Sequence, residues 1–215
     1  MPRLLVLVAA FIACVAHAQH GHQPMHGHFS DAEHWARVFD DPARNKWQKP
    51  DEVIAALALA PDARVADIGS GTGYFAVRLA RAVPQGRVYG ADLEPDMVKY
   101  LNARAEKEKL PNLSAHVAAA DDPKLPAPVD LVLVVDTYHH IDARADYLAG
   151  LRASLRPGAR VAIIDFKPDS PTGPPPAGRI APAQVEKEMA QAGYRRIAAH
   201  DFLPYQYFLV FTPAR

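Results

Sequence analysis

Three glycines at alternate positions, Gly69, Gly71 and Gly73, follow a short apolar segment at residues 65–68 and precede a helical pattern. Because glycine has no Cβ, the backbone at these positions can approach a ligand closely. The helix that follows presents unpaired N–H groups and the positive end of its dipole to whatever lies above the turn. The spacing therefore predicts a nucleotide-like cofactor across the carboxyl edge of a parallel sheet.

Acidic residues end four successive predicted strands: Asp67, Asp92, Asp121 and Asp136. Asp92 stands about twenty residues beyond the glycines, where a carboxylate can accept hydrogen bonds from both hydroxyls of a ribose. Asp121 is placed to meet the exocyclic amine of adenine, and its neighbour Asp122 can take the same role. An acidic rim favours a cofactor that carries an amine and a positive charge over one that carries a pyrophosphate.

The glycine pattern does not match the dinucleotide-binding fingerprint. In G-x-G-x-x-G the third glycine would fall at position 74, which is occupied by Tyr74. The chain also contains no Tyr-x-x-x-Lys pair. A nicotinamide-dependent oxidoreductase is therefore the weaker alternative.

Strand and helix patterns alternate along the chain and place these residues at strand ends. The expected strands lie at 64–68, 87–91, 113–118, 129–135 and 159–165, with helices at 31–39, 51–59, 74–82, 96–109, 141–155 and 182–192. Two further segments, 194–199 and 206–211, have no helix between them and predict an antiparallel pair. We expect an α/β fold that is Rossmann-like and doubly wound. Its seven-stranded sheet is mostly parallel with an antiparallel last strand, and helices precede it.

Composition limits the classes of function. The 215 residues are 49% hydrophobic, which suits one globular domain better than two. The 24 basic and 24 acidic residues balance, and the chain has no basic stripe, so a nucleic-acid partner is not expected. No pattern in the sequence indicates an oligomeric state.

Residues 1–18 have the pattern of a secretory signal peptide. A cationic start, an apolar run of about a dozen residues and the small-x-small site Ala16-His17-Ala18 follow one another. Cleavage after Ala18 predicts export, to the periplasm in a bacterial cell, with no stable membrane insertion afterwards. Two alternatives are an uncleaved membrane anchor and a lipoprotein-type cleavage before Cys14, the only cysteine.

Residues 19–30 form a histidine-rich leader, within a stretch of six histidines between His17 and His34. Such spacing can bind Cu, Ni or Zn transiently, or simply connect the signal to the domain as a flexible polar segment. We expect N-terminal helices within 31–60, the main domain at 61–215, and no metal in the active site. The leader keeps open a second alternative, an exported cofactor- or metal-binding protein without turnover.

Four segments together resemble the class I S-adenosylmethionine-dependent methyltransferases that act on small molecules: 65–74, 88–97, 121–126 and 129–141. Residues 155–161 match that family's loop into the fifth strand. The resemblance covers roughly residues 51–215, and its motifs occur in the expected order. It is specific for the fold and for S-adenosylmethionine as the cofactor, and it does not identify the methyl acceptor.

The resemblance implies roles for the residues around the glycines. The glycine loop would hold the methionine part of the cofactor, Asp67 its amino group, Asp92 the ribose and Leu93 the adenine face. Asp67 also has a structural alternative, as a carboxylate that caps a helix or braces the loop. The expected cofactor-binding residues are Asp67, Gly69, Ser70, Gly71, Gly73, Tyr74, Asp92, Leu93, Asp121, Asp122 and Asp136.

The resemblance also places substrate-facing groups after the fourth strand. The expected catalytic residues are Asp136, Tyr138, His139 and His140. In-line methyl transfer depends mainly on alignment and needs a base only when the acceptor loses a proton. Either histidine can be that base, because imidazole titrates near neutrality. In the structural alternative, one histidine caps the next helix and the other packs against it.

The polar and aromatic segment at 44–50, before the second predicted helix, is expected to contact the cofactor. Trp47 and Gln48 are expected to cover the cofactor, and Arg44 to pair with the cofactor carboxylate. Tyr74 and Tyr138 line the methyl channel or pack beside it. The function expected from the sequence is methyl transfer to a small molecule, with a protein acceptor as a further option.

Overall fold

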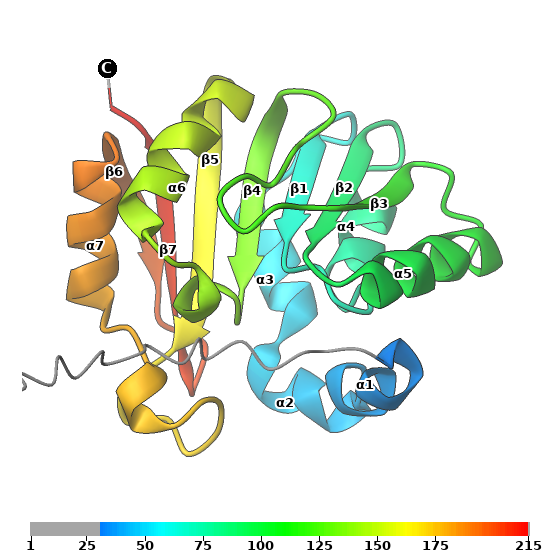
Figure 1. Cartoon of the computed structure of the whole chain (residues 1–215), viewed down its shortest axis with the longest axis horizontal. Helices are drawn as coiled ribbons and strands as arrows, with labels where there is room; N and C mark the ends of the chain where they lie inside the picture. Colours follow the sequence, from blue (N-terminus) through cyan, green and yellow to red (C-terminus); the bar gives the residue numbers. More distant parts are fainter. Residues whose placement is uncertain (1–30, 215) are drawn as a thin grey trace, which may run out of the picture.

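A seven-stranded mixed sheet forms the centre of the molecule (Figure 1). The computed structural model describes residues 31–214. The strand order is β3-β2-β1-β4-β5-β7-β6, and only β7 runs in the direction opposite to the other six strands, which confirms the predicted fold class. The strands are β1 (Arg64–Ile68), β2 (Arg87–Asp92), β3 (Leu113–Val117), β4 (Val129–Val135), β5 (Leu155–Phe166), β6 (Tyr194–His200) and β7 (Gln206–Pro213).

Helices connect the strands and precede the first of them. The α-helices are α1 (Ala32–Phe39), α2 (Asn45–Gln48), α3 (Pro50–Leu57), α4 (Ala76–Ala82), α5 (Pro95–Lys107), α6 (Arg144–Leu151) and α7 (Pro182–Gln191). The short 3-10 helices are η1 (Pro42–Arg44), η2 (Tyr138–His140), η3 (Arg152–Ser154) and η4 (Pro176–Gly178).

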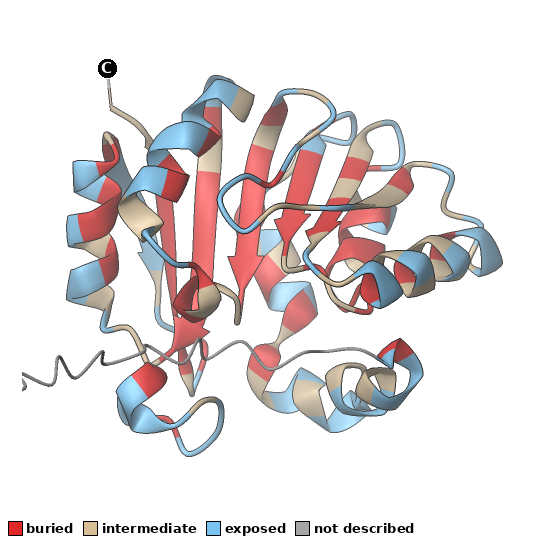
Figure 2. Ribbon diagram, in the orientation of Figure 1, coloured by how far each residue is buried: buried red, intermediate tan, exposed pale blue. Residues whose placement is uncertain are grey.

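Two apolar cores lie on the two faces of the sheet. Successive side chains of a strand point to opposite faces. In β4, Leu131 and Leu133 are buried in the core shared with α3, α4 and α5, whereas Val132 and Val134 are buried in the core shared with α6 and α7. Burial on both faces explains the unbroken apolar run of this strand, and Figure 2 shows the central strands buried along most of their length.

The segment predicted as one helix at 141–155 differs from that prediction. It forms α6 with a 3-10 turn on either side, and β5 begins at Leu155 instead of residue 159. Pro157 and Gly158, which separate the predicted helix from the predicted strand, lie in an exposed irregularity of β5 where the pairing with β4 shifts. Gly158 has a φ of +80°, which glycine adopts without strain.

The carboxyl ends of the parallel strands face the N-terminal helices. In Figure 1, α1 and α2 lie below the sheet, with α1 beneath α5, and the segment between β5 and α7 lies below β5. The strand order reverses at β1, which has β2 on one side and β4 on the other. Ligands of such sheets bind in the crevice at this point, so the fold places the glycine loop where the sequence predicts a cofactor.

Some expectations fall on residues 1–30, outside the described part of the chain. These are the signal peptide at 1–18 and the histidine-rich leader at 19–30. Within residues 31–214, no helix is long and apolar enough to cross a membrane. The same residues contain no group of three or more His, Cys, Asp or Glu side chains that could hold a metal ion.

Tyr138, in η2, anchors the turn after β4 to the helices on one face. Its hydroxyl donates to Glu188 of α7 at 2.5 Å, and Arg144 of α6 donates to the two oxygens of that carboxylate at 2.8 and 3.0 Å. Tyr138 is fully buried, and Glu188 is also buried. Burial alone would raise the pKa of Glu188, but the hydrogen bonds from Arg144 and Tyr138 hold it below its ordinary value.

Replacing Glu188 with Ala should lower the free energy of unfolding by about 2–3 kcal/mol, because Arg144 and the Tyr138 hydroxyl lose their acceptor. Glu188→Gln keeps one acceptor oxygen and should lower the free energy of unfolding by clearly less. Because the pKa is depressed, the contribution of Glu188 is present above its unfolded-state pKa and is lost as pH falls through the folded-state value. Denaturant unfolding measures all three effects, and an Ala variant as stable as the wild type would contradict this role.

Candidate active site

A cavity of about 680 Å³ opens at the carboxyl ends of β1, β2 and β4. The glycine loop after β1 and the turn after β4 line it from the sheet. Side chains of α1, together with Arg44 and Trp47, line it from the N-terminal helices, and residues 172–174 border it from the segment after β5. The cavity therefore lies in the predicted crevice, beneath the helices that were expected to cover it.

The three glycines of the loop have positive φ angles but serve different contacts. A Cβ on Gly69 would lie 2.1 Å from Oγ1 of Thr137, so this glycine lets the loop pack against the turn after β4. A Cβ on Gly73 would lie 2.3 Å from Cδ1 of Leu101 in α5. Gly69 and Gly71 line the cavity, whereas Gly73 does not. Gly73 thus allows the loop to pack closely against α5.

Ser70 lines the cavity, but its hydroxyl points away from the cavity and toward the sheet. A Cβ on Gly90 of β2 would lie 2.8 Å from Ser70 Oγ, so the hydroxyl faces the sheet. Ser70 Oγ is buried and has no hydrogen-bond partner among the described residues.

Asp67, near the end of β1, lines the cavity and is almost completely buried. Burial, and then the nearby carboxylate of Asp92, raise the pKa of Asp67 to about 7. A hydrogen bond from the backbone N–H of Ala76 at the start of α4 acts in the opposite direction. Asp67 thus braces the following helix and also lines the cavity in which the cofactor is expected.

Asp92, at the end of β2, accepts hydrogen bonds from the backbone around it. Its Oδ2 accepts from Gly71 N at 2.7 Å, and its Oδ1 accepts from Glu94 N at 3.0 Å. Burial raises its pKa. Leu93, which is 48% exposed, stands beside it at the rim, and Glu94 adds a third acid to this end of the cavity. Glu94 was missed in the sequence, although it lies only two positions beyond Asp92.

The acids expected near adenine lie elsewhere. The backbone of residues 118–120 lines the cavity, but neither Asp121 nor Asp122 does, and both are exposed. Asp122 Oδ1 accepts a hydrogen bond from Lys124 N at 2.7 Å and so stabilises the local turn. The structure does not bring either carboxylate to the cavity wall, and an isolated bridge pairs Ala119 with Asp122 at this turn.

Asp136, which directly follows β4 and has a φ of +55°, belongs to a closed ring of hydrogen bonds. Arg44 Nη2 donates to Asp136 Oδ2 at 2.9 Å, and the amide of Gln206 donates to Oδ1 of the same carboxylate. Gln48 Nε2 donates to Gln206 Oε1 at 2.6 Å, and Arg44 Nε donates to Gln48 Oε1 at 3.2 Å. Burial raises the pKa of Asp136 to about 7, although Arg44 opposes that change.

This ring changes two expectations for the N-terminal segment. Arg44 was expected to pair with a cofactor carboxylate, but its guanidinium pairs with Asp136 and lies 4.2 Å from the ring centroid of Tyr74. Gln48 is fully buried behind the cavity wall. Trp47 does line the cavity, as does Tyr74, whose hydroxyl donates to Asn45 Oδ1 at 2.6 Å.

His139 forms a buried pair with Asp165 of β5. Its Nδ1 lies 2.9 Å from each oxygen of Asp165, and its backbone N–H donates to Oδ2 at 3.1 Å. His139 and His140 both line the cavity, with ring centroids 4.1 Å apart. Neither histidine caps α6, whose N-cap is Ala143. Asp165 was missed in the sequence, although it is the acid near the end of the fifth strand.

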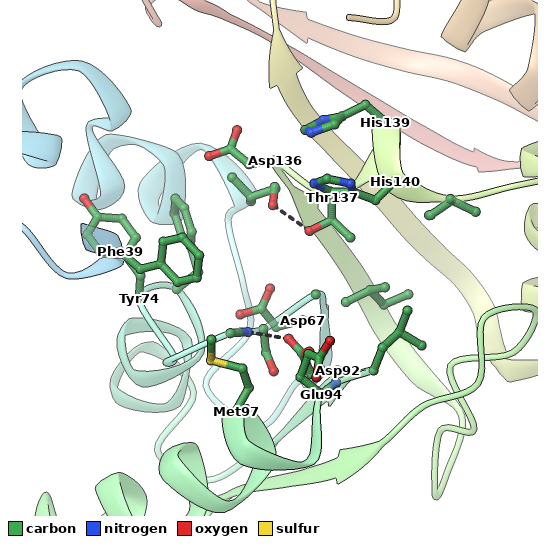
Figure 3. A pocket seen from close by; sticks show the side chains of 18 of the residues that line it. Phe39, Asp67, Tyr74, Asp92, Glu94, Met97, Asp136, Thr137, His139 and His140 are labelled. Carbon is green, nitrogen blue, oxygen red and sulfur yellow. Dashed lines mark hydrogen bonds between the residues drawn. The ribbon is translucent and has the colours of Figure 1, made fainter. Parts of the chain in front are cut away.

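The side chains of the cavity form two groups (Figure 3). Asp136, His139 and His140 lie on one side, and Asp67, Asp92 and Glu94 lie on the other. Tyr138, expected among the catalytic residues, does not line the cavity, because its hydroxyl is turned to Glu188.

The donor set fits S-adenosylmethionine. Buried carboxylates at the carboxyl ends of β1 and β2 suit its amine and ribose hydroxyls, and the apolar rim at Leu93 suits a flat base. Asp67 and Asp92 would hold the polar groups, and the backbone of the glycine loop would lie against the methionine part.

The sequence has related proteins with named activities. The family described as "Methyltransferase domain" matches residues 65–158. A demethylmenaquinone methyltransferase of Deinococcus radiodurans is 34% identical over 116 residues, which are 53% of this chain and 46% of that protein. A 27-O-demethylrifamycin SV methyltransferase of Amycolatopsis mediterranei is 30% identical over 143 residues, which are 66% of this chain and 51% of that protein. The chain thus spans about half the length of these curated relatives.

A solved structure extends the likeness to the whole domain. The crystal structure of a SAM-dependent methyltransferase from Aquifex aeolicus matches with a TM-score of 0.77 at 27% identity, covering 84% of this chain and 97% of that chain. The sheet order, the glycine loop and the matched domain agree with one another. Residues 65–158 match the methyltransferase domain, and the chain has the fold of the class I S-adenosylmethionine-dependent methyltransferases, whose cofactor is S-adenosylmethionine.

Proposed function

We propose that this chain transfers the methyl group of S-adenosylmethionine to a small-molecule acceptor by in-line displacement. The observation that carries the proposal is a single cavity with two chemically different sides. Asp67, Asp92 and Glu94 on one side suit a cationic cofactor, while His139 and His140 on the other side suit an acceptor. S-adenosylmethionine supplies a methyl carbon bound to a positively charged sulfur.

The roles proposed for individual residues follow from their positions. Asp92 accepts the ribose hydroxyls with the lone pairs that its two backbone donors leave available. Asp67 accepts from the cofactor's amino group, and a cation beside it favours its ionised form. Leu93 packs on the adenine at the rim.

The size and surroundings of the cavity support a small acceptor. Its volume of about 680 Å³ lies within the range of small-molecule pockets, roughly 300–1,000 Å³. The formal net charge of zero gives no electrostatic support for a nucleic-acid acceptor. The two curated relatives are named as methyltransferases of demethylmenaquinone and of a demethylrifamycin, which are small molecules.

The chain's own contribution to rate is alignment and exclusion of water. The ring that joins Arg44 and Gln48 to Asp136 and Gln206 holds the N-terminal helices over the carboxyl edge. An enclosed, aligned pair of reactants can gain about 7 kcal/mol or more over the reaction in solution. Trp47 and Tyr74 form part of the apolar enclosure.

Asp92→Ala should weaken S-adenosylmethionine binding by about 1–3 kcal/mol, roughly 5- to 150-fold in Kd, because charge-assisted hydrogen bonds to the ribose are lost. Asp121→Ala is the matched control, since this exposed carboxylate does not line the cavity, and it should bind as the wild type does. Calorimetric titration measures both, and transfer of a labelled methyl group to a panel of phenols, thiols and amines tests turnover. Failure of the wild type to bind the cofactor would refute the proposed function.

The affinity for S-adenosylmethionine should increase by up to about tenfold as pH rises from about 6 to 8, because Asp67 has a pKa of about 7 and binds a cation when ionised. Asp67→Asn cannot ionise and should lose this part of the pH dependence. The cofactor's own amine titrates identically in both experiments, so the difference isolates Asp67. Parallel pH profiles for the two proteins would contradict the assignment.

We also propose that the chain is exported with removal of residues 1–18. The cationic start, the apolar run and Ala16-His17-Ala18 support this proposal. N-terminal sequencing of the protein from the periplasmic fraction of a Gram-negative expression host should begin at Gln19. An intact N-terminus in the cytoplasmic fraction would refute export, and a mature chain that starts at Cys14 would show lipoprotein processing instead.

A further inference from the structure

Asp165 accepts three hydrogen bonds, and together they fix the orientation of the His139 ring. The backbone N–H of His139 and that of Phe166 donate to the Asp165 carboxylate at 3.1 and 2.7 Å, and the imidazole Nδ1 lies 2.9 Å from both oxygens. The side chains of His139 and Asp165 are only 4% and 1% exposed. A buried carboxylate with this many donors is held in one position.

This arrangement determines which nitrogen of His139 carries the proton. A carboxylate can only accept, so Nδ1 must be the donor and the neutral ring carries its proton there. Nε2 then holds a lone pair on the opposite side of a ring that lines the cavity. Nε2 makes no hydrogen bond with any of the residues 31–214.

The surroundings of His139 are aromatic. Phe166 and Trp47 both line the cavity with ring centroids 6.0 Å apart, and Phe166 lies 6.5 Å from the His139 ring. Gly173 lets the following segment close onto Phe166, since a Cβ there would lie 2.5 Å from the Phe166 ring. Such walls favour a flat aromatic ligand, because aromatic pairs gain about 0.5–1.5 kcal/mol beyond area burial.

We infer that the methyl acceptor is an aromatic hydroxyl compound, a phenol, whose proton passes to His139 Nε2 while Asp165 acts as the positioning residue. The inference rests on the proposed function and names the substrate class of that same site. An acceptor that must lose a proton explains a buried, oriented base, which a thioether or a tertiary amine would not require. The aromatic walls distinguish a phenol from an aliphatic alcohol.

The proposed step is balanced. The phenol oxygen forms a bond to the methyl carbon, and the carbon–sulfur bond breaks with its electron pair left on sulfur. The hydroxyl proton goes to Nε2 of His139. The resulting imidazolium is stabilised by Asp165, and by Asp136, which interacts electrostatically with His139 while paired to Arg44. His140, beside it, is another titratable group on the same turn.

The tautomer can be observed without turnover. In the full chain labelled with ¹⁵N-histidine, neutral His139 should give the Nδ1–H pattern, assigned by its absence in His139→Gln. The backbone N–H groups of His139 and Phe166 donate to different oxygens of Asp165, so Asp165→Asn leaves one acceptor oxygen for these two donors and Nδ1. The Nδ1–H form of His139 should therefore lose its preference, and the share of the Nε2–H form should increase. A wild-type protein with the Nε2–H tautomer would overturn the inference.

Kinetic measurements test whether methyl transfer depends on the orientation of His139 by Asp165. Asp165→Asn should lower kcat for 2-naphthol by about 10²- to 10⁴-fold, the scale of base catalysis and of a tautomer imposed wrongly on a catalytic histidine in serine proteases. The Kd of S-adenosylmethionine should change less than about twofold, because Asp165 lies away from the acidic side of the cavity. Asp169→Asn is the matched control, since this nearby carboxylate is exposed and does not line the cavity, and its kcat should equal that of the wild type.

The acceptor itself supplies the sharpest comparison. At a pH where 4-nitrophenol is already ionised, it needs no base, so Asp165→Asn should reduce its methylation far less than that of 2-naphthol. Equal losses for the two phenols, or transfer by the wild type to amines and aliphatic thiols but to no phenol, would overturn the inference. If S-adenosylmethionine does not bind at all, the proposed function fails as well; if it binds and transfer is insensitive to Asp165, only the inference on the acceptor fails.

Discussion

Ionised carboxylates cannot be buried without partners, and this constraint shapes the whole carboxyl edge of the sheet. Two of its acids are paired by the protein itself, because Asp136 meets Arg44 and Asp165 meets His139. Asp67 and Asp92 instead accept hydrogen bonds from backbone groups, and burial raises the pKa of Asp67 to about 7. The edge is thus divided into acids that the protein neutralises and acids that a cationic ligand would neutralise. S-adenosylmethionine, the cofactor of the family, carries the positive charge that would neutralise Asp67 and Asp92.

The pairing of Asp136 also explains why helices that precede the sheet belong to the site. Arg44 and Gln48 come from the N-terminal segment, yet their hydrogen bonds close a ring through Gln206 of β7. Removing any member would leave a buried polar group without a partner, which costs about 1–3 kcal/mol. The N-terminal helices that cover the cavity are therefore held in place by the same requirement that shapes the carboxyl edge of the sheet, namely that a buried carboxylate needs a partner. Tyr74 is held in this cover, with Arg44 4.2 Å from its ring centroid.

The sequence patterns predicted the strands better than they predicted the contacts between side chains. β1 and β4 have the expected bounds, because apolar runs between turns identify buried strands without knowledge of their neighbours. Side-chain direction in loops and long-range pairing have no such local signal. Arg44 and Asp136 are 92 positions apart, and His139 and Asp165 are 26 apart. For the same reason Gly73 looked like part of a ligand cradle but packs on Leu101, and Asp121 and Asp122 looked like adenine contacts but lie outside the cavity wall.

The central claim is that Asp67 and Asp92 form the polar end of a cofactor site in this cavity. The most direct measurement is a crystal structure of the chain with S-adenosylhomocysteine, the product form of the cofactor. We predict electron density for the ligand in the cavity at the ends of β1 and β2, with both ribose hydroxyls within hydrogen-bond distance of the Asp92 carboxylate. Density at another place on the molecule, or a ribose bound without contact to Asp92, would contradict the account.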